Sequence, residues 1–320
     1  MRRGAFGEGG LVVGSIRNVS SGKTQLLEPE HLIGRAPTSA LCLPHRYVSA
    51  QHATIRWSGA GWELRDLGSR NGTFLDGSRL KPGEEYPMRV GSKIAFGKLL
   101  EEQWELVDAS GPKVMAVPVD GGDPVLLDGD LLALPSNEDP RVTIYRNPDG
   151  AWGLEQPDDA AIPITNMQTF DVGGRVWRFC CTGNSRTTSL AVTQPEPEVR
   201  NLQLSFSVSA DEEHVQLQMT SVGKTVDMGA RNHNYLLLTL ARRRLAEVAE
   251  GLPETACGWI HQEELAHDPT MAPPQLNIDV FRIRKQFSLL GVIDAASIVE
   301  RRPGTHQLRI GTGAITITKL

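Results

Sequence analysis

The stretch from Leu32 to Phe74 constrains the fold of this chain more than any other, because strand-like segments alternate in it with turn signals. His52–Trp57 and Gly61–Asp66 alternate apolar and polar residues with the period of two that is typical of half-buried β-strands. Asn71-Gly72 follows them and is the strongest short hairpin signal, because both residues tolerate the positive φ of a type I′ turn. A β-meander with ordinary turns explains this much without any ligand.

The polar residues in those turns indicate a ligand. Arg35 and Arg70 each offer a planar fork of donors that suits a phosphate. Ser49 adds a hydroxyl, and Asn71 adds an amide that can bond an extended peptide backbone. The sequence places no acid–base pair, nucleophile–base pair or metal-ligand cluster beside them. We therefore predict a site that holds a phosphate without cleaving it, with no enzymatic activity and no cofactor.

Three short motifs occur here in a fixed order: Gly34-Arg35, Ser49-Ala50-Gln51-His52 and Ser69-Arg70-Asn71-Gly72. In this order and spacing they resemble the forkhead-associated (FHA) family, whose pattern is GR, SxxH and a Ser/Thr-x-Asn-Gly turn. The resemblance implies an eleven-stranded β-sandwich whose loops at one end bind a phosphothreonine peptide. The implied partner is a phosphothreonine-containing protein, such as a Ser/Thr kinase or its substrate.

The resemblance also implies roles for single residues. Arg35 and Ser49 would hold the phosphate, Arg70 would lie beside them, and Asn71 would bond the peptide backbone. The residues implied as structural braces of these loops are Gly34, His52 and Gly72.

Two further positions concern ligand choice. Tyr47 stands two residues before Ser49, at a position that in the FHA family often helps to read the residue three past the phosphothreonine. Its apolar ring favours an aliphatic residue there over Asp, although the neighbouring Arg46 favours an acid. Ala50 stands where many relatives carry Arg or Asn, which removes one ligand contact.

Length and composition describe a multidomain soluble protein. The chain has 320 residues, 40% of them hydrophobic and 22% charged, with a net charge of −5, and this length suits two or three domains. No apolar run approaches the roughly 20 residues of a membrane helix, and residues 1–10 lack the apolar core of a signal peptide. We therefore expect a cytoplasmic protein with no membrane partner. The four cysteines form no CxxC pair, so we expect them reduced and without metal: Cys42, Cys180, Cys181 and Cys257.

Strand and turn patterns divide the first two thirds of the chain. We assign residues 1–110 to the FHA domain and residues 111–183 to a second β-rich module. The run Ala151-Trp152-Gly153-Leu154 echoes Gly61-Trp62-Glu63-Leu64, but the three FHA motifs are missing from the second segment. It is either a separate, degenerate FHA-like module or an extension of the first sandwich. Residues 111–200 carry 7 Lys and Arg against 13 Asp and Glu, which argues against nucleic-acid contact there.

Residues 184–199 have the composition of a linker, in which a Ser/Thr-rich run is followed by Pro-Glu-Pro-Glu. Thr187, Thr188 and Thr193 lie in it. A phosphate on one of them would create the ligand class predicted for the FHA domain, within one chain or between two self-associating chains. A plain spacer explains the same composition.

From residue 200 the pattern changes to a winged-helix type. Alternation predicts strands at 202–208, 215–219 and 222–228, and a period of 3.6 predicts helices at 232–249, 259–266 and 273–290, followed by a hairpin at 298–310. This order, with Tyr235–Leu240, Glu263–Leu265 and Asn277–Lys285 in the three helices, resembles the α+β winged helix-turn-helix of OmpR/PhoB-type regulators. We assign residues 200–320 to this domain.

The resemblance implies that the third helix and the hairpin bind duplex DNA. The cations clustered on these two elements are Arg282, Arg284, Lys285, Arg301, Arg302 and His306. A solvated helix face or a protein-interaction module explains the same cluster. Two hypotheses follow for the whole protein: a transcription regulator that couples Ser/Thr kinase signalling to DNA, or a scaffold that binds proteins at both ends.

Overall fold

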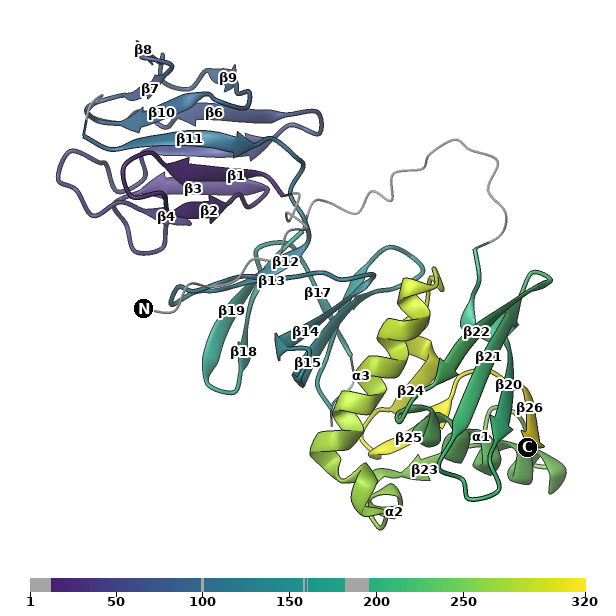
Figure 1. The fold of residues 1–320 in the computed structure, drawn as a ribbon. Helices are drawn as coiled ribbons and strands as arrows, with labels where there is room; N and C mark the ends of the chain where they lie inside the picture. Colours follow the sequence, from purple (N-terminus) through teal and green to yellow (C-terminus); the bar gives the residue numbers. More distant parts are fainter. Residues whose placement is uncertain (1–12, 99–100, 158, 160, 182–195) are drawn as a thin grey trace. The chain divides into compact units, whose positions relative to one another are not determined.

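The computed structural model describes residues 13–98, 101–157, 159, 161–181 and 196–320 (Figure 1). These residues form two compact units. The first contains the residues up to Val114, together with Cys180 and Cys181, and the second contains Met115–Phe179 and the residues from Glu196 onward.

The first unit is a β-sandwich of a six-stranded sheet, ordered β2-β1-β11-β10-β7-β8, and a five-stranded sheet, ordered β4-β3-β5-β6-β9. Its strands are β1 Ser15–Asn18, β2 Thr24–Leu26, β3 Glu30–Gly34, β4 Leu41–Cys42, β5 Ala53–Trp57, β6 Trp62–Asp66, β7 Thr73–Leu75, β8 Ser78–Arg79, β9 Glu85–Pro87, β10 Lys93–Phe96 and β11 Gln103–Asp108. The eleven-stranded sandwich expected from the FHA resemblance is confirmed.

Alternation along the strands builds the core of this sandwich. Ile55 of β5 pairs with Leu64 of β6, and both side chains are fully buried together with Ile33 and Ile94. Each such side chain contributes roughly 1.5–3 kcal/mol when it leaves water. The loops that carry the FHA motifs lie between strands of this core: β3 to β4, β4 to β5, and β6 to β7.

The second unit begins with a strand module, Met115–Phe179, made of two four-stranded sheets ordered β13-β12-β19-β18 and β14-β15-β16-β17. Its strands are β12 Met115–Pro118, β13 Val125–Leu126, β14 Leu131–Ser136, β15 Asp139–Arg146, β16 Trp152–Glu155, β17 Ile162–Ile164, β18 Thr169–Val172 and β19 Arg175–Cys180. This order repeats that of the first sandwich with β4, β7 and β8 omitted. Of the omitted strands, β4 and β7 flank the motif-bearing loops.

The rest of the second unit is a C-terminal module, residues 199–320. Its elements are η1 Val199–Asn201, β20 Gln203–Val208, β21 Val215–Ser221, β22 Lys224–Ala230, α1 Asn234–Ala249, β23 Ile260–His261, α2 Gln262–Leu265, η2 Pro269–Met271, α3 Pro273–Leu289, η3 Ala295–Ile298, β24 Val299–Arg302, β25 Gln307–Ile310 and β26 Ala314–Lys319. One sheet has the order β22-β21-β20-β26 and the other β23-β25-β24 (Figure 1).

Packing and turn chemistry account for the helices of this module. Leu236, Leu237 and Leu240 of α1 are buried in the same core as Ile283 and Phe287 of α3. Pro273 occupies the first position of α3, where its missing N–H costs nothing. The helix ends before Gly291, whose φ of +82° suits glycine.

Two elements differ from the sequence prediction. Helix α2 has one turn instead of the expected two, because Ile260-His261 forms a short strand with β25. The last strand, β26, was not predicted, and it pairs in parallel with β20. None of the helices in the described part of the chain is long and apolar enough to cross a membrane.

Candidate phosphopeptide site

The loops after β3 and β4 are joined by backbone hydrogen bonds that present Arg35 and Ser49 together. The Arg35 N–H donates to the Ser49 carbonyl at 2.8 Å, and Arg35 Nε donates to the Val48 carbonyl at 3.3 Å. A Cβ on Gly34 would lie 2.1 Å from the Ala50 carbonyl oxygen, so only glycine permits this close approach. The guanidinium of Arg35 is exposed at the surface beside the half-buried Ser49.

The turn after β6 brings Arg70 and Asn71 to the same loops. The Arg70 backbone N–H donates to Ser49 Oγ at 3.1 Å, and Asn71 Nδ2 donates to the Tyr47 carbonyl at 2.8 Å. Gly72 has a φ of +88°. The Asn71 amide therefore ties its own turn to the Ser49 loop. It has one further N–H and an acceptor oxygen that a peptide backbone can use.

The His52 side chain is hydrogen-bonded to the loop that contains Ser49 and to the turn that contains Gly72. Its Nδ1 accepts the Ser49 N–H at 3.0 Å, which leaves the proton on Nε2, 3.1 Å from the Gly72 carbonyl oxygen. The side chain is fully buried. Burial lowers the pKa of His52, while the Gly72 hydrogen bond and the charge of Asp66 oppose this effect. The neutral ring is therefore the form that makes both hydrogen bonds to the loops.

Asp66 is a second brace, whose role the sequence analysis missed. Its carboxylate accepts hydrogen bonds from the Ser69 and Thr73 hydroxyls, each at 2.6 Å, and from the backbone N–H groups of Gly68 and Ser69. Burial by itself raises the pKa of Asp66, but these hydrogen bonds together outweigh it and lower the pKa. The signal in the sequence is the spacing of an Asp three and seven residues before two hydroxyl residues.

The Tyr47 ring, which borders the site, is contacted by an aromatic ring and by a cation. The His45 ring stacks on it with centroids 5.0 Å apart, and Lys98 Nζ lies 5.1 Å from its centroid on a cation–π contact. Burial raises the pKa of the hydroxyl, with Glu101 and Glu102 adding to the effect. The structure therefore brings all five predicted ligand-binding residues to one end of the sandwich: Arg35, Tyr47, Ser49, Arg70 and Asn71.

The six cations predicted to bind DNA do not share one exposed face, and this part of the prediction needs correction. The Arg284 side chain is 3% exposed and donates to the Glu155 carboxylate at 2.7 and 3.3 Å. Arg301 is 9% exposed and lies 2.9 Å from the same carboxylate. Lys285 pairs with Asp128 at 2.5 Å. The reason is tertiary, since the partners are carboxylates of the strand module more than a hundred residues earlier in the chain.

Three of the six cations remain at the surface. Arg282 is exposed on α3, and Arg302 and His306 are exposed on the hairpin. The Arg302 guanidinium lies over the Trp259 ring at 5.6 Å. The cationic surface is thus smaller than the sequence predicted.

Among the described residues, no group of three His, Cys, Asp or Glu side chains is arranged to hold a metal ion. Thr187, Thr188 and Thr193 of the predicted linker lie outside the described residues.

Comparisons with known proteins concern the N-terminal part of the chain. Residues 31–97 match the family model of the FHA domain. The chain is 36% identical over 80 residues to the FHA domain-containing protein FhaB of Mycobacterium tuberculosis, which covers 25% of this chain and 50% of FhaB. It is 32% identical over 98 residues to the glycogen accumulation regulator GarA of Mycolicibacterium smegmatis, which covers 30% of this chain and 57% of GarA.

A solved structure, the FhaA FHA domain complexed with the intracellular domain of Rv3910, is 31% identical and covers 29% of this chain and 97% of that chain, with a TM-score of 0.25. The chain spans about half the length of the curated relatives that it matches first. The motif-bearing loops, the family model and these relatives together support an FHA domain at residues 31–97.

Proposed function

We propose that this chain is a phosphothreonine-peptide-binding signalling protein. One observation carries the proposal: Arg35, Ser49, Arg70 and Asn71 reach one end of the sandwich from three loops that are hydrogen-bonded to each other. FHA domains bind phosphothreonine peptides in signalling, and the similar protein FhaB is an FHA domain-containing protein. The proposed partner is a Ser/Thr kinase or one of its phosphorylated substrates.

The site is preorganised for a dianionic ligand. A phosphothreonine carries a charge of about −1.5 to −2 at pH 7 and three acceptor oxygens. The Arg35 fork and the Ser49 hydroxyl supply donors whose backbone positions are already set by hydrogen bonds. Because the loops do not have to be ordered on binding, more of the interaction energy becomes affinity.

The test is a fluorescence anisotropy titration of the full chain with a phosphothreonine peptide library and its unphosphorylated counterpart. A hydrogen bond to a charged group is worth roughly 1.5–3 kcal/mol, so Arg35→Ala should weaken phosphopeptide binding by about tenfold to a hundredfold. Arg65→Ala is the matched control, because Arg65 is an exposed arginine on β6 of the same sandwich. Equal affinity for phosphorylated and plain peptides would refute the proposal.

A second candidate function concerns the C-terminal module. The order α1, β23, α2, α3 and the hairpin β24–β25 favours the winged helix-turn-helix and hence a transcription regulator that couples kinase signalling to DNA. The burial of Arg284 and Arg301 favours the alternative, a scaffold in which this module makes protein contacts.

The salt dependence of binding to duplex DNA discriminates between these alternatives. Each phosphate contact adds about 0.9 to the slope of log K against log salt. A winged helix that binds DNA should therefore lose affinity steeply as salt rises. A scaffold protein should not bind duplex DNA even at low salt.

A further inference from the structure

The strand module packs against one face of α3 and contacts Arg301 of the hairpin, the two elements that would contact DNA. Phe281 of α3 packs in one cluster with Leu131 and Ala133 of β14, and Tyr145 of β15 packs against it. At the end of α3, Ser288 Oγ accepts the Asp130 N–H at 2.8 Å. This apolar cluster has three buried side chains, and ion pairs join the same two modules.

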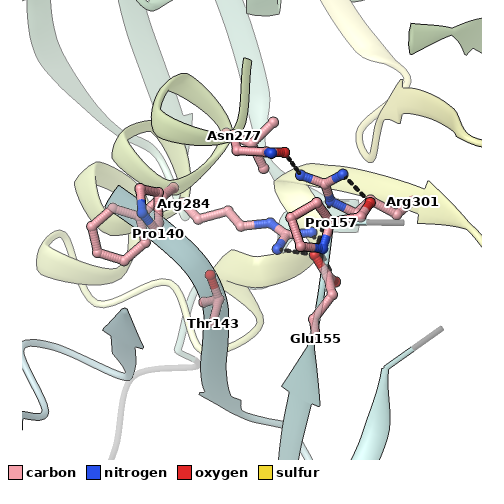
Figure 2. Close-up of a pocket in the computed structure, with 9 residues that line it drawn as sticks. Pro140, Thr143, Glu155, Pro157, Asn277, Arg284 and Arg301 are labelled. Atoms are coloured by element: carbon pink, nitrogen blue, oxygen red, sulfur yellow. Dashed lines mark hydrogen bonds and ion pairs between the residues drawn. The ribbon is translucent and has the colours of Figure 1, made fainter. Parts of the chain in front are cut away.

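The two buried arginines are oriented within the C-terminal module itself. Arg284 Nη2 donates to the Val299 carbonyl of β24 at 2.7 Å, and Arg301 Nη2 donates to Asn277 Oδ1 of α3 at 2.9 Å. These two bonds link the helix and the hairpin to each other. Both guanidiniums contact the Glu155 carboxylate, Arg284 through Nη1 and Arg301 through Nε (Figure 2).

A second carboxylate of the strand module pairs with a cation of α3. Asp128 pairs with Lys285. The pKa of Glu138 is lowered, mainly by hydrogen bonding to Ser136 and in addition by the charges of Lys285 and Arg282. Two carboxylates of the strand module thus pair with three cations of the C-terminal module: Glu155 with Arg284 and Arg301, and Asp128 with Lys285.

We propose that the strand module is an internal competitor of DNA, whose carboxylates take the places of backbone phosphates on α3 and the hairpin. The proposal rests on the second candidate function given above. A phosphate oxygen and a carboxylate oxygen are equivalent acceptors for an arginine fork, so the contact and DNA compete for the same donors. Small, polar interfaces between parts of one chain are of the kind that opens. DNA binding therefore requires release of the strand module.

The closing experiment titrates labelled random-sequence duplex DNA with the full chain at low salt, for wild type and Glu155→Gln/Asp128→Asn. Both substitutions lie on the strand module and leave every cation of α3 in place. The double variant should bind DNA at least about tenfold more tightly, because the binding-competent fraction rises, and its salt slope should be steeper.

The control is Asp120→Asn/Asp123→Asn, which changes the net charge by the same two units. Asp120 pairs with Arg175 inside the strand module, and Asp123 is an exposed residue of the same β12–β13 turn. This control variant should bind DNA with the same affinity as the wild type. Asp128→Asn alone, at a side chain that is 56% exposed, serves as a second variant if loss of Glu155 prevents folding. It should still tighten binding by about threefold.

The outcomes separate the proposal from the function on which it rests. If the wild type, Glu155→Gln/Asp128→Asn, Asp128→Asn and the control all bind DNA equally, DNA binding stands and the competitor proposal is overturned. If no form binds DNA at low salt while the phosphopeptide is still bound, the DNA function fails and the proposal fails with it.

Discussion

Arg35 and Arg284 are the same residue type in two regions of one molecule, and their surroundings give them opposite roles. Arg35 lies exposed on a loop of the N-terminal sandwich, with backbone hydrogen bonds that set its position. Arg284 is buried on α3 and forms two hydrogen bonds to one carboxylate. An arginine that is positioned but exposed is available for a ligand, whereas one that already has its anion is not.

The N-terminal sandwich and the strand module have the same sheet order, but they differ in what covers the outer face of one sheet. Arg65 lies three residues after Trp62 and is exposed, while Glu155 lies three residues after Trp152 and is buried. The outer face around Arg65 is charged, with Arg56 bridging Glu63 and Glu85. In the strand module the equivalent sheet is covered by α3. The same sheet order thus presents an exposed charged face in the first sandwich and a face packed against α3 in the strand module.

The largest expected effect separates the two arginines of α3. Arg284→Ala should lower the free energy of unfolding of the second unit by about 3 kcal/mol, because Glu155 and the Val299 carbonyl lose a buried partner. Arg282→Ala, two residues earlier and exposed, should change it by less than about 0.5 kcal/mol. Chemical denaturation measures both. Equal, small losses would mean that the Glu155 contact does not persist in solution.

The second prediction tests the opposite behaviour at Arg35. Arg35→Lys keeps the charge but loses the planar fork, so phosphopeptide affinity should fall by about tenfold, the equivalent of roughly 1.4 kcal/mol. The free energy of unfolding should hardly change, since the side chain is exposed. Anisotropy and thermal unfolding of the same samples give the two values. A loss of stability without a loss of affinity would assign Arg35 a structural role.

The third prediction concerns pH and the His52 brace. The folded pKa of His52 lies below its unfolded value of about 6.5 because burial disfavours the charged ring. The unfolded chain therefore binds the proton first, and stability should fall as pH drops below about 6.5 and be unaffected above it. His52→Asn should be less stable at neutral pH but should show a flatter stability profile between pH 7 and 5. If the variant shows the same dependence of stability on pH as the wild type, His52 is not the group that causes this dependence.

The smallest expected effect concerns the peptide residue three past the phosphothreonine. Because the Tyr47 ring is positioned by its contacts with His45 and Lys98, a Leu at that position should bind about fivefold more tightly than an Asp, equivalent to roughly 1 kcal/mol of apolar burial. Leu and Asp variants of one peptide, titrated against the full chain, provide the comparison. Tighter binding of the Asp peptide would instead favour readout by Arg46 or Lys98.

Local sequence pattern was sufficient to predict the FHA sandwich and the loops that meet at one end of it. Period-two alternation determines which side chains face the core, and the Asn-Gly turn and the close approach at Gly34 depend on residues within a few positions. Asp66 was overlooked although its partners are local, because a carboxylate next to a turn is common and only the hydrogen bonds reveal its use.

Tertiary structure alone decided which of the C-terminal cations are buried and paired. The sequence determined that Arg284 and Arg301 belong to a helix and a hairpin, but their anion is Glu155, 129 residues before Arg284. No local pattern encodes a contact across that separation, because it depends on which sheet face packs on α3. A charged cluster in a sequence predicts an electrostatic partner, and burial and packing determine whether that partner is another molecule or the chain itself.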